Sequence, residues 1–155
     1  MIRRKHKKHS LENFLSIILT LFQPHNLNQE FFLVGNLTLF SIFHFFLCDN
    51  NLIEVKNVTL FREKDVAEFP DAVTSRGTKH LNMLIKSIKK GYKPYVLFLT
   101  QIQNINNFRI AKDIDRIYFE NYKKAKKAGV KFLAYRCKLS SKEIKIEKKI
   151  NIIDE

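Results

Sequence analysis

The sequence predicts an α/β fold with a mixed central sheet flanked by helices. Residues Leu52 to Leu60 form a β-branched run with alternating pattern, typical of a half-buried strand. Tyr95 to Leu99 are continuously apolar, as in a strand buried on both faces. Residues 76–90 and 114–128 read as amphipathic helices, each followed by a glycine. Alternation of such strands and helices is the layout of an α/β domain.

The first half of the chain contains two apolar runs. Leu11 to Phe22 repeat at helical spacing and stop before Pro24. Phe31 to Leu47 form the second run, and we expect its second half, 38–47, to be a strand. The turn Asp49-Asn50-Asn51 then predicts a hairpin with the strand 52–60.

The remaining elements are expected in regular order. Residues 62–65 read as a polar connection, and Thr74 or Ser75 as the cap of a helix that Gly91 ends. After the strand 95–99, a polar loop leads to a helix that ends at Gly129. Residues 130–137 predict a further strand, and 144–150 an edge strand.

Composition points to a folded, cationic protein. The 155 residues are 45% hydrophobic, which excludes wholesale disorder, and carry a net charge of +13. Such an excess favours a polyanionic partner, namely nucleic acid or, less favoured, an acidic membrane surface. Cys48 and Cys137 stand far apart without metal-ligand spacing. This indicates reduced thiols, no structural zinc and a cytoplasmic location.

A membrane location is the weaker expectation. The basic start, MIRRKHKKH, followed by an apolar segment is also how a signal peptide begins, but Glu12 and Asn13 interrupt it. The run 31–47 is shorter than the roughly 20 residues that span a bilayer. Membrane association through residues 11–47 stays open as an alternative.

Glu54 and Lys56 are the most informative pair. Their i, i+2 spacing in a strand puts both side chains on one face. A carboxylate can hold a divalent cation while a lysine orients water and offsets phosphate charge, as in metal-dependent phosphodiester cleavage. A surface ion pair is the structural alternative.

Five segments carry a family resemblance: EVKNVTL (54–60), FPDAVTSRGTKHL (69–81), VLFLTQ (96–101), FRIAKDIDRIY (108–118) and GVKFLAYRCKLS (129–140). In order, spacing and content they resemble the C-terminal domain of the sugar fermentation stimulation protein (SfsA) family. The resemblance implies a fold like that of the PD-(D/E)xK nucleases and non-sequence-specific DNA binding in the cytoplasm. It places this domain at residues 41–155.

The chain departs from the family pattern in two places. Residues 1–40 do not match the OB-like barrel with which family members begin, so the chain resembles a truncated member. His44 stands where the family has an aspartate that would share a metal with Glu54. Imidazole is a poor ligand for Mg²⁺, although Mn²⁺ or Zn²⁺ tolerates it. His44 is therefore read as a degenerate metal ligand or as a core residue.

Other candidates lie around the FPDA segment. Asp71 is a further metal ligand beside Glu54, or a turn residue after Pro70. Arg76 and Lys79, together with Lys56, are candidates for binding phosphate oxygens near a helix start. His80 reads as a satisfied, partly buried residue rather than a general base. The lysine-rich C-terminal part, with Lys123, Lys124, Lys126, Lys127, Lys142, Lys145, Lys148 and Lys149, reads as solvated faces that add a sequence-independent attraction to phosphates.

These observations favour a regulatory DNA-binding protein that contacts the phosphate backbone and lacks efficient catalysis. The alternative is a nuclease dependent on Mg²⁺ or Mn²⁺ that uses Glu54 and Lys56. No small-molecule substrate is evident from the sequence. No helix-turn-helix or zinc-finger signature predicts base recognition.

Overall fold

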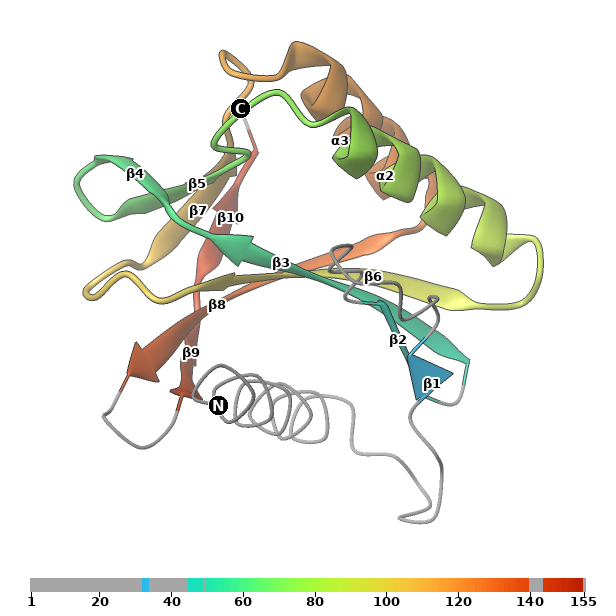
Figure 1. The fold of residues 1–155 in the computed structure, drawn as a ribbon, viewed down its shortest axis with the longest axis horizontal. Helices are drawn as coiled ribbons and strands as arrows, with labels where there is room; N and C mark the ends of the chain where they lie inside the picture. The colour runs from blue at the N-terminus through green and yellow to red at the C-terminus, as the bar shows by residue number, and fades with distance from the viewer. Residues whose placement is uncertain (1–31, 34–44, 49, 140–143, 155) are drawn as a thin grey trace, which may run out of the picture.

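The computed structural model describes residues 32–33, 45–48, 50–139 and 144–154. These residues form two mixed β-sheets and two α-helices, a mixed α/β arrangement (Figure 1). One sheet has six strands in the order β1-β2-β3-β6-β8-β9, and the other has four in the order β10-β7-β5-β4.

The six-stranded sheet has a parallel centre and antiparallel edges. Its strands are β1 (Phe32–Leu33), β2 (Phe45–Cys48), β3 (Asn51–Val58), β6 (Lys93–Thr100), β8 (Lys131–Leu139) and β9 (Ile144–Lys149). β3, β6 and β8 are parallel, whereas β2 pairs antiparallel with β3 and β9 antiparallel with β8. The predicted hairpin is confirmed, since Cys48 pairs with Asn51.

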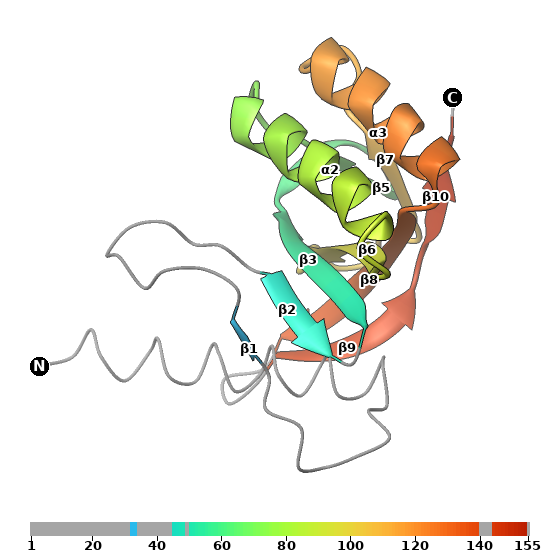
Figure 2. The ribbon, with the colours of Figure 1, turned by 90° about the vertical axis from the view of Figure 1, so that its right-hand side faces the viewer.

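Both helices cover the same face of this sheet. α2 (Ser75–Ile88) lies between β3 and β6 in sequence, and α3 (Arg116–Ala128) lies between β6 and β8. Parallel strands that follow one another in one direction place their right-handed crossovers on one face. Figures 1 and 2 show the two helices side by side above the sheet, where they pack against each other.

The main core fills the space between the helices and the sheet. The helices contribute apolar side chains that meet buried residues of the strands; the cluster includes Leu81, Leu84, Val96, Phe98, Phe108, Tyr118, Tyr122, Ala125 and Ala134. Phe98 stacks on Phe108 with ring centroids 4.3 Å apart. Leu97 and Leu99 point to the opposite face of β6 and are also buried. The expectation that residues 95–99 form a strand buried on both faces is thereby confirmed for residues 96–99.

Four short strands form the second sheet. They are β4 (Leu60–Glu63), β5 (Val66–Phe69), β7 (Asn107–Ile110) and β10 (Asn151–Ile153). The prediction that residues 62–65 are only a polar connection was wrong, because Arg62 and Glu63 end β4 and only the turn beyond them is irregular. The polar loop before α3 likewise contains β7. These strands hold three or four residues each, too few for the period-2 pattern to appear in the sequence.

Helix boundaries follow the predicted caps closely. Thr74 is the N-cap of α2, and Gly129 ends α3 in the left-handed conformation with φ 108°. α2 ends slightly earlier than expected, at the C-cap Lys89, while Gly91 adopts φ 85° two residues later. Residues 144–149 form β9 at the edge of the larger sheet, as predicted.

Several expectations concern residues outside the described part of the chain. The helix over 11–22 and most of the strand 38–47 belong there, and the domain boundary at residue 41 stays a prediction. Among the residues that the structure describes, neither helix has the length and apolar character needed to cross a membrane.

A buried carboxylate holds the smaller sheet together. Glu68, in the inner strand β5, is fully buried and accepts hydrogen bonds from Arg62 Nε and Nη2 at 2.7 and 2.9 Å. Arg109 Nε, from the neighbouring strand β7, donates to Glu68 Oε1 at 2.9 Å. Hydrogen bonding from Arg62, and then from Arg109, lowers the pKa of Glu68 despite its burial. Because both cations also reach solvent-exposed acids, Asp113 and Glu63, the network extends from the core to the surface.

Replacing this carboxylate should destabilise the protein. We expect Glu68→Gln to lower the free energy of unfolding by about 3 kcal/mol, because two arginines lose a buried counter-charge. Since the pKa of Glu68 is lowered from 4.5, its contribution is present above that pH and is lost as the pH falls through the folded-state pKa. Urea unfolding between pH 3.5 and 7 measures both effects. In the matched control, Glu63→Gln, an exposed partner of Arg109 is lost, and the cost should stay below about 1 kcal/mol. Equal costs for the two variants would contradict the role given to Glu68.

Candidate functional site

The acid and the lysine singled out in the sequence lie on one face of β3. Glu54 and Lys56 are alternate residues of a strand that pairs with β2 on one side and β6 on the other. Lys56 Nζ lies 2.6 Å from Glu54 Oε1, so the two side chains point the same way. Glu54 is 2% exposed, and the side chain of Lys56 is 14% exposed. This geometry is a buried ion pair in the central sheet and not the surface pair of the structural alternative.

A third residue completes the cluster. His80, from α2, places Nδ1 2.6 Å from the same Glu54 Oε1 and is itself buried. A carboxylate oxygen only accepts, so Nδ1 carries the hydrogen and donates it. Glu54 Oε1 thus receives one donor from its own strand and one from the helix above. His80 is a satisfied buried residue, and its link to Glu54 was not foreseen from the sequence.

The start of α2 is fixed by α3. Thr74 Oγ1 accepts a hydrogen bond from the Gly77 amide at 2.9 Å. Asp115, the N-cap of α3, accepts through one oxygen from the Thr74 amide at 2.7 Å and through the other from the Tyr118 amide at 2.8 Å. A Cβ on Gly77 would lie 2.9 Å from the Thr74 side chain and 3.0 Å from the Tyr118 ring. Glycine here therefore permits the close approach between the first turn of α2 and Tyr118 of α3.

The second oxygen of Glu54 has a different environment. Oε2 is buried and accepts no hydrogen bond from the described residues. The buried hydroxyl of Tyr118 likewise has no hydrogen-bond partner among them. Burial, and then the nearby Glu54 carboxylate, raises the pKa of Tyr118 well above its usual value. A buried polar atom without a partner is costly and marks a place where a water or an ion can be held.

The described residues do not by themselves make a divalent-metal site. No group of three His, Cys, Asp or Glu side chains within the described ranges is arranged to hold a metal ion. Mg²⁺ prefers six oxygen ligands, whereas Glu54 offers one oxygen that is not already bonded. Asp71 is exposed and accepts from Thr59 Oγ1 at 3.4 Å, so its direct contact is to the chain after β3. His44 lies outside the described residues.

The candidate phosphate-binding residues lie on the exposed side of α2. Arg76 and Lys79 are both exposed and lie in the first two turns of α2. The first turn contains no acidic residue. Arg76 precedes His80 by about one helical turn, but its side chain is exposed, whereas His80 is buried. The structure thus joins Glu54, Lys56 and His80 directly, and Arg76 and Lys79 stand on the exposed surface of the same helix.

Comparisons with known proteins identify relatives of this chain. Residues 40–143 match the family described as "Sugar fermentation stimulation protein RE domain". A sugar fermentation stimulation protein homolog of Pelagibacter ubique is 66% identical over 113 residues, which cover 70% of this chain and 49% of that protein. A homolog of Clostridium acetobutylicum is 44% identical over 101 residues, or 65% of this chain and 44% of its own length.

A solved structure shows the same fold. The structure of Pyrococcus furiosus SfsA in complex with Ca²⁺ aligns with a TM-score of 0.64 and 27% identity, over 71% of this chain and 48% of that one. It confirms the fold class expected from the resemblance. The chain spans about half the length of the curated relatives it matches. The family model matches residues 40–143, about two thirds of the chain, and the fold matches that of a solved family member. This chain therefore belongs to the sugar fermentation stimulation protein family.

Proposed function

We propose that this protein binds double-stranded DNA without sequence preference, through the phosphate backbone, and that it lacks efficient catalysis. The observation that carries the proposal is the cluster around Glu54, whose bonded oxygen is held by Lys56 and His80 while Arg76 and Lys79 stand exposed on the adjacent helix. An acid and an amine on one sheet face are also the groups from which a metal-dependent phosphodiesterase site is built, and this likeness supports a phosphate ligand.

Charge supports a phosphate partner. The chain carries 28 Lys and Arg against 15 Asp and Glu. Cations that neutralise phosphates release condensed counterions, so such binding is sequence-independent and depends steeply on salt. Contacts to phosphates position a protein on DNA and carry no base information. A regulatory role on DNA and a cytoplasmic location follow as part of this proposal.

The chemistry around Glu54 argues against efficient cleavage. Metal-dependent phosphodiester hydrolysis needs a cation held by several oxygens, and the described residues supply one free oxygen of Glu54. Lys56 already neutralises the charge of Glu54, and His80 is bonded to the same oxygen, so that oxygen attracts a second cation only weakly. Lys56 is fixed in this pair and therefore poorly placed to activate water.

Binding should weaken sharply as salt rises. With about three phosphates neutralised, affinity for a 30-base-pair duplex should fall about 40-fold between 50 and 200 mM NaCl. Replacing both Arg76 and Lys79 by Ala should make the slope of log affinity against log salt shallower by about 2, because each lost contact removes about one unit. Fluorescence anisotropy with duplexes of unrelated sequence measures both quantities.

The matched control removes the same charge from the other end of the helix. Lys86 and Lys90 are exposed at the end of α2, and their double Ala variant should retain the slope within about half a unit. A slope that is flat in the parent protein would exclude phosphate contacts. Equal losses in both double variants would assign the attraction to overall charge and not to the start of α2.

The alternative function is a divalent-metal-dependent nuclease that uses Glu54 and Lys56. It is favoured by the Ca²⁺ in the Pyrococcus furiosus relative and by the unbonded Oε2 of Glu54. In such an enzyme Glu54 would hold Mg²⁺ or Mn²⁺, with His44 and Asp71 as the other proposed ligands. The bound cation would stabilise charge on the phosphate, while Lys56 would orient the attacking water.

Plasmid cleavage separates the two functions. We expect supercoiled plasmid to stay intact with 10 mM Mg²⁺ or 1 mM Mn²⁺, because the described residues offer too few oxygen ligands for either ion. Agarose electrophoresis over several hours provides the readout. Nicking that disappears in both Glu54→Gln and Lys56→Met would replace the first proposal by the nuclease. Nicking that persists in both variants would indicate a contaminant.

A further inference from the structure

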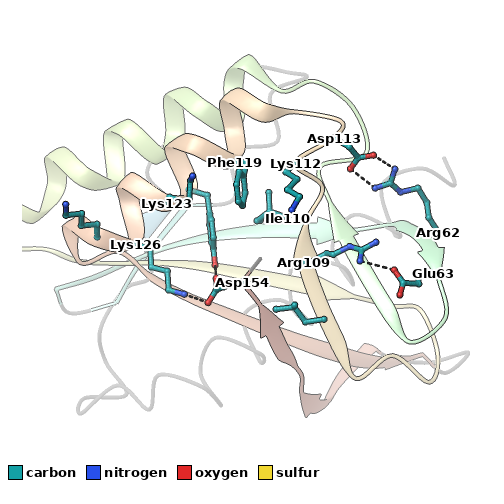
Figure 3. Close-up of a pocket in the computed structure, with 13 residues that line it drawn as sticks. Arg62, Glu63, Arg109, Ile110, Lys112, Asp113, Phe119, Lys123, Lys126 and Asp154 are labelled. Atoms are coloured by element: carbon teal, nitrogen blue, oxygen red, sulfur yellow. Dashed lines mark hydrogen bonds and ion pairs between the residues drawn. The ribbon is translucent and has the colours of Figure 1, made fainter.

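A large cavity lies away from the Glu54 cluster. It has a volume of about 920 Å³ and is bounded by α3, by β7, by the ends of β4 and β10 and by the segment before α3 (Figure 3). Glu54, Lys56 and His80 are not among its lining residues. Cavities of several hundred Å³ are typical of small-molecule sites.

The floor of the cavity is apolar and aromatic. Ile110 of β7, Ile153 of β10 and Phe119 of α3 line it, together with the ring of Tyr122. Lys123 Nζ lies 4.8 Å from the centroid of the Phe119 ring. Phe119 is only partly buried, packs against the core and lines the cavity. An aromatic ring can stack on another flat ring system, and a neighbouring ammonium group can contact an anionic group attached to that system.

The acids of the cavity wall are all paired. Asp113 accepts from Arg62 Nη1 and Nη2 at 2.6 and 2.9 Å, and this pairing lowers the pKa of Asp113 to about 2. Glu63 Oε2 lies 2.8 Å from Arg109 Nη1. Asp154 forms a salt bridge with Lys126 and accepts from Tyr122 Oη, and Lys126 is the main cause of its lowered pKa.

More cations than acids line the cavity: Arg62, Arg109, Lys112, Lys123, Lys126 and Lys127 against Glu63, Asp113 and Asp154. Both arginines also share the buried Glu68, which lies outside the lining. Lys123 forms an exposed helix-surface pair with Glu120, a weak interaction that a stronger anion can displace. The six cations of the lining exceed its three acids together with Glu68 and Glu120 by one, so the cavity has a net positive charge. An anion is therefore the favoured occupant.

We propose that this cavity binds a nucleotide, with the base against Phe119 and the phosphate near the lysines of α3. The apolar floor disfavours a sugar phosphate, which has no flat apolar surface to bury. The lysines disfavour a neutral aromatic compound. The site is independent of the duplex-binding surface proposed on α2. The nucleotide can be a free one or an unstacked one within a single strand, since both present the same base and phosphate.

Titration with a nucleotide and its two fragments tests the pocket. By isothermal titration calorimetry, AMP should bind with one-site saturation and at least about tenfold more tightly than adenosine or ribose 5-phosphate, because each fragment lacks one of the two contacts. Ribose 5-phosphate that binds as tightly as AMP would overturn the role of the aromatic floor. The absence of saturable AMP binding up to 5 mM would overturn the proposal as a whole.

Variants locate the binding in the cavity. Lys127→Ala and Phe119→Leu should each weaken AMP binding about three- to tenfold, through the loss of charge and of ring stacking. Lys124→Ala is the matched control, because Lys124 is exposed on the same helix and does not line the cavity. Equal weakening by Lys124→Ala and Lys127→Ala would overturn the site in favour of general attraction by α3. Thermal unfolding of each variant without AMP excludes loss of folding as the cause.

A single-stranded oligonucleotide distinguishes the two sources of nucleotide. If a four-nucleotide poly-dA strand binds more tightly than AMP and loses that advantage in Phe119→Leu, the occupant is a nucleotide within a strand. If AMP binds at least as tightly, a free nucleotide is the occupant. Duplex binding should be unaffected by Phe119→Leu and reduced by the Arg76 and Lys79 variant, so either proposal can fail without the other.

Discussion

Parallel pairing of β3, β6 and β8 is the constraint on which the arrangement of this protein depends. The three strands succeed one another in one direction, and their crossovers therefore place α2 and α3 on the same face. The two helices then pack against each other, and the carboxylate of Asp115 joins their first turns. From this position α2 sets His80 on Glu54, and α3 forms one wall of the cationic cavity.

Each of the two sheets buries one carboxylate, and in each case two basic side chains bind it. Glu54 is held by a lysine from its own strand and a histidine from α2, whereas Glu68 is held by two arginines from neighbouring strands. Isolated buried charge is very costly, so each acid requires these partners. The difference lies in the second oxygen: both oxygens of Glu68 are bonded, while Oε2 of Glu54 receives no donor from the described residues. Glu68 is thus structural, and Glu54 retains the capacity for a further ligand.

The two proposals concern two different cationic surfaces of the protein, each of which suits a different ligand. The start of α2 presents Arg76 and Lys79 as exposed cations, which suit the charge of a duplex backbone. The cavity beside α3 combines lysines with Phe119 and Ile110 in a concave site, which suits a single base and its phosphate. Lysines that look alike in the sequence thus differ in their place: Lys127 lines the cavity, whereas Lys124 lies on the same helix outside it.

The sequence by itself determined the elements that local pattern encodes. The strand over 52–58, the buried strand over 96–99, both helices and the caps at Thr74 and Gly129 follow from periodicity and from single-residue preferences. The shared face of Glu54 and Lys56 was equally accessible, because alternation in a strand is a local property. Only the tertiary structure decided the smaller sheet, the contact of His80 with Glu54 and the cavity. The strands around Glu68 are too short to show a period, and His80 lies 26 residues from Glu54. Contacts between residues so far apart are set by the chain's path through the sheet, for which no local pattern exists.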